Sequence, residues 1–101
     1  MIFIYTTCAT VDEAEYLGKI IVEKKLASCV DYWAVNSMFY WENKLKKVSQ
    51  VMIMITTFEP KFETVNDLIS EHHSYSVPMI GGVDISRINR KYKEWMISEI
   101  K

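Results

Sequence analysis

The fold of this chain is decided by residues 28–58, which read SCVDYWAVNSMFYWENKLKKVSQVMIMITTF. Two long runs rich in Val, Ile, Tyr, Phe, Trp and Thr meet there at the polar break Glu42-Asn43-Lys44. This pattern is typical of an antiparallel hairpin. Asn43 is predicted at the tip, because asparagine tolerates the left-handed backbone conformation that a tight turn requires.

The predicted hairpin is too long for the body of one small domain. Arms of about 13 residues at about 3.3 Å per residue give a length of about 43 Å. A compact domain of this size has a radius of gyration near ~13 Å, so the hairpin must project beyond its core. The projecting part carries large apolar residues: Trp33, Val35, Met38, Phe39, Tyr40 and Trp41. An exposed apolar strand invites aggregation, so we expect an assembly arm that other copies of the chain bury.

The composition is that of one ordinary domain spanning residues 1–101, half hydrophobic and a quarter charged. The net charge of −1 gives no electrostatic reason to expect nucleic acid or an anionic membrane as a partner. There is no membrane-length apolar run and no basic leader, so a cytoplasmic location is expected. Cys8 and Cys29 make neither a disulfide framework nor a CxxC metal pair, so reduced, buried thiols are expected.

The part of the chain before the hairpin predicts a strand followed by a helix. Ile2 to Cys8 is a short apolar run of β-formers, typical of a central strand. Thr10 and Glu13 have the spacing of a capping box, in which each side chain satisfies a free backbone amide. The helix that follows should bury the apolar residues that recur at helical period: Val11, Ala14, Leu17, Gly18, Ile21 and Val22.

The part of the chain after the hairpin predicts a second helix, a strand and a third helix. Pro60 suits the first turn of the second helix, which should run to about His72. A strand is predicted from Ser76, with Pro78 on a sheet edge and Gly81-Gly82 marking a bulge or a close backbone approach. Asn89 is predicted to cap the third helix. The side chains predicted to be buried there are Tyr92, Trp95 and Met96.

This order, β-α-β-β-α-β with an added C-terminal helix, predicts an α+β ferredoxin-like sandwich with a long hairpin between its second and third strands. Both main helices then lie on one face of a four-stranded sheet. Residues 51–55 (VMIMI) are apolar on both faces, so the second face needs cover from elsewhere. A neighbouring subunit is the expected source, in agreement with the long hairpin.

Five short motifs, in order and at similar spacing, resemble those of the CutA family of divalent-cation tolerance proteins. They are Leu26-Ala27-Ser28-Cys29-Val30, Ser37 to Trp41, Ile55-Thr56-Thr57, His72 to Pro78, and Tyr92 with Trp95. The resemblance implies a ferredoxin-like homotrimer, related in fold to PII signalling proteins, whose hairpins wrap their neighbours. It also implies tolerance to copper and other divalent cations.

The chain departs from the family pattern at four positions. Asn43 stands where glycine is usual, and Gln50 stands where glutamate is usual. Thr56 and Met79 replace a typical lysine and a typical glutamate. Losing the carboxylate at Met79 removes a candidate hard ligand beside the histidine pair, so a polar site in the subunit cleft is expected to be weakened.

The candidate metal ligands are His73, His72 and Cys8, with Cu(II) or another divalent cation as the ion. Imidazole suits Cu(II), but adjacent histidines on a helix point about 100° apart and cannot easily chelate one ion. His72 continues an apolar stripe and is predicted to be packed, which leaves His73 as the better ligand. In some family members a first-strand cysteine is a proposed copper ligand. Thr6 occupies that position here, and Cys8, two residues on, is the candidate substitute.

The aromatic residues Tyr40, Trp41 and Tyr75 match family positions around the intersubunit cleft, where interface packing is expected before ligand binding. Cys29, in the second strand, is expected to be a core thiol near the same cleft. No enzyme motif is found: there is no nucleophile elbow, metalloprotease helix or phosphate-binding glycine loop. The alternatives to metal binding are a PII-like signalling or scaffold trimer that binds a small molecule or partner protein in its cleft, and a trimer whose main property is stability.

Overall fold

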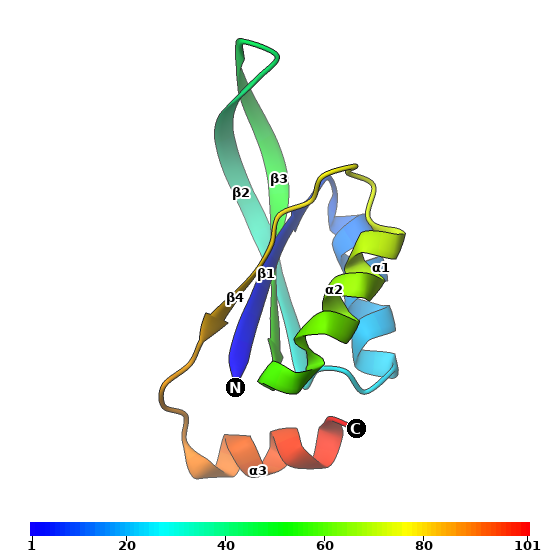
Figure 1. Cartoon of the computed structure of the whole chain (residues 1–101), viewed down its shortest axis with the longest axis vertical. Helices are drawn as coiled ribbons and strands as arrows, with labels where there is room; N and C mark the ends of the chain where they lie inside the picture. Colours follow the sequence, from blue (N-terminus) through cyan, green and yellow to red (C-terminus); the bar gives the residue numbers. More distant parts are fainter.

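Residues 1–101 are all described by the computed structural model, which has two layers (Figure 1). The elements are β1 (Ile2–Cys8), α1 (Val11–Glu23), β2 (Cys29–Trp41), β3 (Lys44–Thr57), the short 3-10 helix η1 (Glu59–Lys61), α2 (Phe62–His72), β4 (Ile80–Asp84) and α3 (Arg90–Glu99). The strands form one antiparallel sheet in the order β2-β3-β1-β4, with α1 and α2 on the same face. This confirms the predicted ferredoxin-like arrangement with β1 in a central position.

The core lies between the sheet and the two helices. Ile4 of β1 pairs with Ile55 of β3, and both are fully buried. The helices cover them with four fully buried side chains: Leu17, Ile21, Val65 and Ile69. Gly18 lets α1 approach β2 closely, since a Cβ there would lie 3.0 Å from a methyl carbon of Val30. Each fully buried Leu or Ile side chain stabilises the fold by about 1.5–3 kcal/mol, so this layer supplies most of the stability.

The long hairpin is present with the predicted tip. Its ladder runs without interruption from the Cys29–Thr56 pair to the Trp41–Lys44 pair. Glu42 and Asn43 have φ of 53° and 62°, the left-handed values that a two-residue hairpin turn of the primed type requires. The molecule is 47 Å long with a radius of gyration of 14.4 Å, because the hairpin extends past the helices (Figure 1).

The second face of the sheet is left open by the chain. Along β3, Val51 and Ile53 are buried beneath the helices, whereas Met52 and Met54 on the opposite face are only half-buried. Trp33, paired with Met52 across the ladder, is 44% exposed. We call this surface the open face; its central side chains are Phe3, Tyr5, Trp33, Met52 and Met54. The structure confirms that the helices cover one face only.

The last strand differs from the prediction. β4 begins at Ile80 rather than at Ser76, so Pro78 lies in the preceding loop and not on a sheet edge. No bulge is found at Gly81-Gly82, because the β1–β4 register is continuous from Ile2–Asp84 to Thr6–Ile80. The alternative, a close approach, is confirmed, since a Cβ at Gly82 would lie 3.3 Å from the Phe62 ring.

Three predictions about the helices are also corrected. Pro60 lies in η1 and not in α2, although α2 ends at His72 as predicted. Val11 is 49% exposed because it occupies the outer side of the first turn of α1. In α3 only Met96 is buried and Trp95 is 46% exposed, because the helix lies at the end of the sheet rather than across it (Figure 1). None of the three helices is long and apolar enough to cross a membrane.

Candidate functional site

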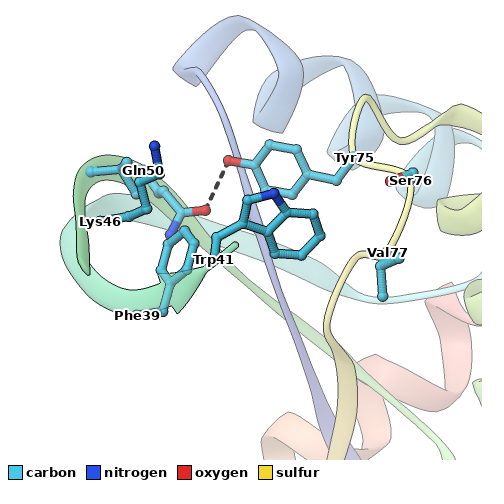
Figure 2. A pocket seen from close by; sticks show the side chains of 8 residues that line it. Phe39, Trp41, Lys46, Gln50, Tyr75, Ser76 and Val77 are labelled. Atoms are coloured by element: carbon cyan, nitrogen blue, oxygen red, sulfur yellow. Dashed lines mark hydrogen bonds between the residues drawn. The ribbon is translucent and has the colours of Figure 1, made fainter. Parts of the chain in front are cut away.

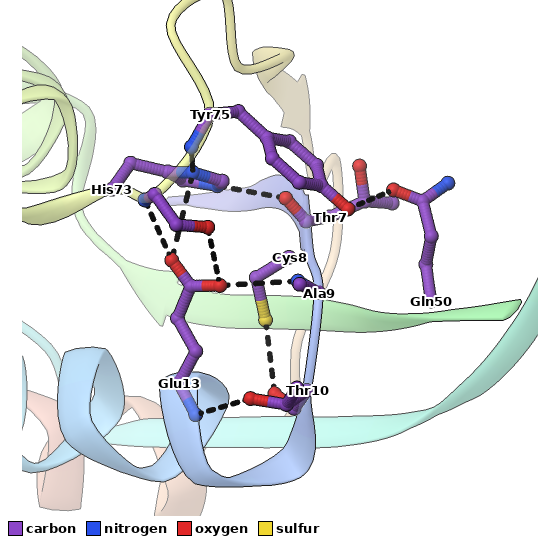
Figure 3. A network of polar contacts seen from close by, with 9 residues as sticks. Thr7, Cys8, Ala9, Thr10, Glu13, Gln50, His73 and Tyr75 are labelled. Carbon is purple, nitrogen blue, oxygen red and sulfur yellow. Dashed lines mark hydrogen bonds and ion pairs between the residues drawn. The ribbon is translucent and has the colours of Figure 1, made fainter. Parts of the chain in front are cut away.

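A polar cluster joins the end of β1, the start of α1 and the loop after α2, with Glu13 at its centre (Figure 3). The predicted capping box forms: Thr10 Oγ1 accepts the Glu13 amide at 3.1 Å, and Glu13 Oε1 accepts the Ala9 amide at 3.1 Å. The same carboxylate also accepts the Ser74 amide at 2.7 Å and the Ser74 hydroxyl at 2.8 Å. Glu13 therefore both caps a helix and fastens a distant loop.

The charge of Glu13 is stabilised by this arrangement. Burial by itself would raise the pKa of the carboxyl. The hydrogen bonds from Ser74 and Ala9 outweigh burial and lower the pKa below its ordinary value. Glu13 is therefore an anion at neutral pH. Because it accepts from three donors, it is bound to the fold and is not a free base or an open metal ligand.

His73 is the buried histidine of the pair, with a fully buried side chain. Its Nε2 lies 2.8 Å from the Thr7 carbonyl oxygen, which can only accept, so Nε2 carries the proton. Its Nδ1 accepts the Tyr75 amide at 3.0 Å, and the two rings lie 4.9 Å apart between centroids. Both ring nitrogens are thus engaged within the chain, as a packed histidine requires. A metal ion at His73 must displace one of these bonds.

Cys8 and Tyr75 lie beside Glu13 in the same cluster (Figure 3). Burial raises the pKa of the Cys8 thiol to about 11, with a further contribution from the Glu13 charge, so the thiolate is disfavoured at neutral pH. Burial also raises the pKa of Tyr75, and Cys8 and Glu13 add to the effect. Tyr75 is therefore a neutral donor, and its hydroxyl donates to Gln50 Oε1 at 2.8 Å.

A hollow of about 420 Å³ lies between the hairpin and the loop after α2. We call it the hairpin hollow; its lining residues are Phe39, Trp41, Lys46, Val48, Gln50, Tyr75, Ser76 and Val77. The Trp41 and Tyr75 side chains project into it from opposite sides (Figure 2). Lys46 is the only lining side chain that carries a charge at neutral pH. The hollow suits a flat apolar group with a negative charge, or side chains of another copy.

The other predicted site residues lie elsewhere. His72, half-buried at the end of α2, places Nδ1 3.2 Å from the Tyr16 hydroxyl, and its Nε2 has no partner in the chain. Cys29 is only half-buried, so it is not the core thiol that the sequence predicted. It donates to the Asp31 carboxylate at 3.6 Å, and burial, followed by the charge of Asp31, raises its pKa. Tyr40 is 74% exposed near the hairpin tip and does not line the hollow.

A complete metal site is not formed by one chain. No group of three or more His, Cys, Asp or Glu side chains is close enough to hold an ion. Within the cluster, His73 is saturated with hydrogen bonds and the Cys8 thiol is protonated at neutral pH. The donor set of a single chain therefore does not fit a resident divalent ion, and the ligand roles of His72, His73 and Cys8 stay predictions.

The comparisons with known proteins decide the family. The family model described as CutA1 divalent ion tolerance protein matches residues 2–99. The chain belongs to this family. The match confirms the resemblance of the sequence motifs over nearly the whole chain, and the CutA1 family is described by divalent ion tolerance rather than by a reaction.

Curated relatives and solved structures of the CutA1 family agree with this assignment. The divalent-cation tolerance protein CutA of Archaeoglobus fulgidus is 35% identical over 94 residues, 93% of this chain and 92% of that protein. Its solved structure, described as periplasmic, has a TM-score of 0.96 at 33% identity, with both chains fully covered. The crystal structure of CutA1 from Pyrococcus horikoshii also has a TM-score of 0.96, at 30% identity, and covers 100% of this chain and 99% of that one. The predicted cytoplasmic location of the present chain stays a prediction.

Two members of the polar cluster were not foreseen as site residues. The capping box indicates from the sequence that Glu13 lies at the start of α1. Its hydrogen bonds with Ser74 could not be predicted, because they depend on the tertiary fold. In the sequence, Gln50 stands out only as a departure from the CutA1 pattern. Its partnership with Tyr75 joins residues 25 positions apart and has no local sequence signal.

Proposed function

We propose that this chain serves divalent-cation tolerance as a homotrimer in which neighbouring copies bury the open face and the hairpin. The observation that carries this proposal is the open face itself. Tyr5, Met52 and Met54 form an apolar surface on a central part of the sheet that no element of the chain covers. The Tyr5 hydroxyl finds only the Met54 sulfur as a partner, at 3.4 Å.

The hairpin supports a ring rather than a two-fold pair. A projecting arm that contacts a different surface of its neighbour makes a heterologous contact, and such contacts form a ring when the rotation between neighbours closes. The hairpin extends past the helices and exposes Met38, Phe39 and Trp41 by 66%, 42% and 55%. Side chains of this size gain about 25 cal/mol for each Å² that assembly removes from water. Three copies are the number that the CutA resemblance implies.

Divalent metal, with Cu(II) as the first candidate, is the ligand we assign to this assembly. Because one chain lacks a complete donor set, the bound ion takes ligands from more than one copy. The sequence favoured His73, but the geometry favours His72. Only His72 keeps a ring nitrogen without a partner, and it is half-exposed at the end of a helix. Cys8 is the weaker candidate, because its thiol must first lose a proton.

A calorimetric titration of chelator-stripped protein with Cu(II) and Zn(II) tests this function. The wild type is compared with His72→Ala, His73→Ala and the double variant. We expect saturable Cu(II) binding that His72→Ala weakens by about tenfold or more and that the double variant abolishes. Binding that is absent in the wild type, or that survives in the double variant, contradicts a histidine metal site.

The hairpin hollow favours a second function, that of a PII-like scaffold which binds a small molecule. Trp41 and Tyr75 offer two flat faces, and Lys46 offers one positive charge. Benzoate and adenosine monophosphate combine a ring with a negative charge and serve as probes. A rise in the melting temperature of metal-free protein, lost in Trp41→Ala but kept in Tyr40→Ala, favours this function. Tyr40 is the matched control because it is exposed beside Trp41 without lining the hollow.

A further inference from the structure

A second hollow lies where the linker between β4 and α3 passes the start of β1. Its volume is about 380 Å³, and its lining residues are Met1, Ile85, Ser86, Arg87, Ile88 and Lys93. The Glu13 cluster lies at the other end of β1, so the two sites are far apart (Figure 1). We call this second site the linker hollow. Neither divalent-cation tolerance nor the hairpin hollow makes use of it.

The ionisable side chains that line the linker hollow are all positively charged. Its two ionisable side chains, Arg87 and Lys93, are both cations, and no carboxylate lines it. Residues 85–93, which read ISRINRKYK, contain four cations and no acidic residue, although acidic residues outnumber basic ones in the whole chain. Among the twelve Lys and Arg residues, only Lys25 and Arg90 form ion pairs, with Glu99 and Glu94. Arg87 and Lys93 have no such partner.

The backbone that carries these two side chains is fixed at both ends. The Ile85 amide donates to the Met1 carbonyl at 3.0 Å, which holds the linker against β1. The Lys93 amide donates to the Asn89 carbonyl at 3.2 Å, in the first turn of α3. Met96, one turn further along α3, is fully buried and anchors the helix. The two cations therefore reach the hollow from separate elements whose relative position is set by the fold.

We propose that the linker hollow binds the phosphate group of a small soluble anion. The guanidinium of Arg87 presents a planar fork that matches two phosphate oxygens, and the ammonium of Lys93 supplies a second charge. Ser86, which also lines the hollow, brings a hydroxyl that can donate. A phosphate group carries about two negative charges at neutral pH and so balances the two unpaired cations. Ile85 and Ile88 supply apolar walls for the organic part of a phosphate ester.

Nuclear magnetic resonance tests the site, because it locates binding on the chain. Amide spectra of the assembled protein are recorded during titration with inorganic phosphate and with pyrophosphate, at constant ionic strength set by chloride. We expect saturable shifts centred on the amides of Ser86, Arg87 and Lys93. The absence of saturable shifts there, with both probes, overturns the proposal and leaves an ordinary solvated cationic surface.

Two double variants distinguish a specific anion site in the linker hollow from general electrostatic attraction to a cationic surface. Arg87→Gln with Lys93→Gln removes both lining cations, and we expect it to weaken pyrophosphate binding by about tenfold or more. Arg90→Gln with Lys91→Gln makes the same charge change outside the hollow, and we expect a change of less than about threefold. Equal weakening by the two double variants overturns the proposal. All four side chains belong to exposed residues, so the fold should survive in each variant.

Phosphate groups also occur on lipids, and a second probe distinguishes that source. Phosphatidylcholine vesicles that contain phosphatidic acid are sedimented with the wild type and with the Arg87→Gln, Lys93→Gln variant. We expect the soluble probes to bind and the vesicles to retain no more wild type than variant. Binding to the vesicles without binding of phosphate or pyrophosphate overturns the assignment to a soluble anion.

Discussion

Glu13 and Ser74 are 61 residues apart in the sequence, yet two hydrogen bonds of 2.7 and 2.8 Å join the carboxylate of one to the amide and hydroxyl of the other. The pair fastens the loop after α2 to the start of α1. The same loop carries Tyr75, Ser76 and Val77 into the wall of the hairpin hollow (Figure 2). Glu13 thus determines the shape of a surface that its own side chain does not reach.

Replacement of Glu13 by glutamine should destabilise the fold. Glu13→Gln keeps one acceptor oxygen but loses the charge-assisted bonds, and hydrogen bonds to charged groups contribute about 1.5–3 kcal/mol. We expect the free energy of unfolding in urea to fall by about that amount. Glu23→Gln, at the exposed end of the same helix, is the matched control and should change it by less than about 0.5 kcal/mol.

The stability difference between wild type and Glu13→Gln should also depend on pH, and the lowered pKa of Glu13 gives the direction. The pKa of Glu13 is lowered in the folded state, so its contribution is fully present above the ordinary value of 4.5 and is lost as the pH falls through the lowered value. The stability difference between wild type and Glu13→Gln should therefore shrink between pH 5 and the acid limit of folding. A difference that stays constant over this range would contradict the assigned role.

Two buried threonines should respond oppositely to the same substitution. Thr57 Oγ1 donates to the Leu26 carbonyl at 2.6 Å, whereas Thr6 Oγ1 is buried without any partner. Thr57→Val should cost about 1–2 kcal/mol, because it leaves a buried carbonyl unpaired. Thr6→Val should be neutral or stabilising by up to about 1 kcal/mol, because it removes an unsatisfied hydroxyl. Thermal unfolding of both variants checks this prediction, and the two are matched because each is a Thr→Val change in a central strand. Equal losses of stability in the two variants would show that the hydroxyl contacts are wrongly assigned.

The two cysteines should differ in reactivity. Cys8 is fully buried and its pKa is raised to about 11, whereas Cys29 is only half-buried. With iodoacetamide at pH 8, peptide mass spectrometry should show Cys8 modified far more slowly than Cys29. In denaturant the two rates should become equal. Faster modification of Cys8 in the folded protein would mean that the end of β1 opens to solvent.

Local chemistry made the hairpin and the layer order predictable. The turn residue Asn43 and the alternating apolar pattern around it are local signals, and they specify the register of the whole ladder. The start of β4 was predicted four residues early, because Val77 and Met79 have strand propensity but Pro78 cannot donate to a ladder. Burial in α3 was overestimated because periodicity does not show where a terminal helix lies on the sheet.

The polar cluster was less accessible to sequence reasoning. His72 and His73 were correctly seen as different, since neighbours on a helix point apart, but which one is enclosed depends on contacts with Thr7 and Tyr16 far away in the chain. The helix-period argument favoured burial of His72. The structure instead buries His73 completely, because the chain leaves the helix at that residue and turns its ring beneath Tyr75.

The central claim, that copies of this chain assemble through the open face, is tested most directly by sedimentation equilibrium at micromolar concentration. We predict a species of three times 11.9 kDa for the wild type. Met52→Lys, which places a charge on the open face, should dissociate it, and Val11→Lys, on the exposed side of α1, should not. A wild-type protein that sediments as a single chain would contradict the assembly, and with it the proposal that a bound ion takes ligands from more than one copy.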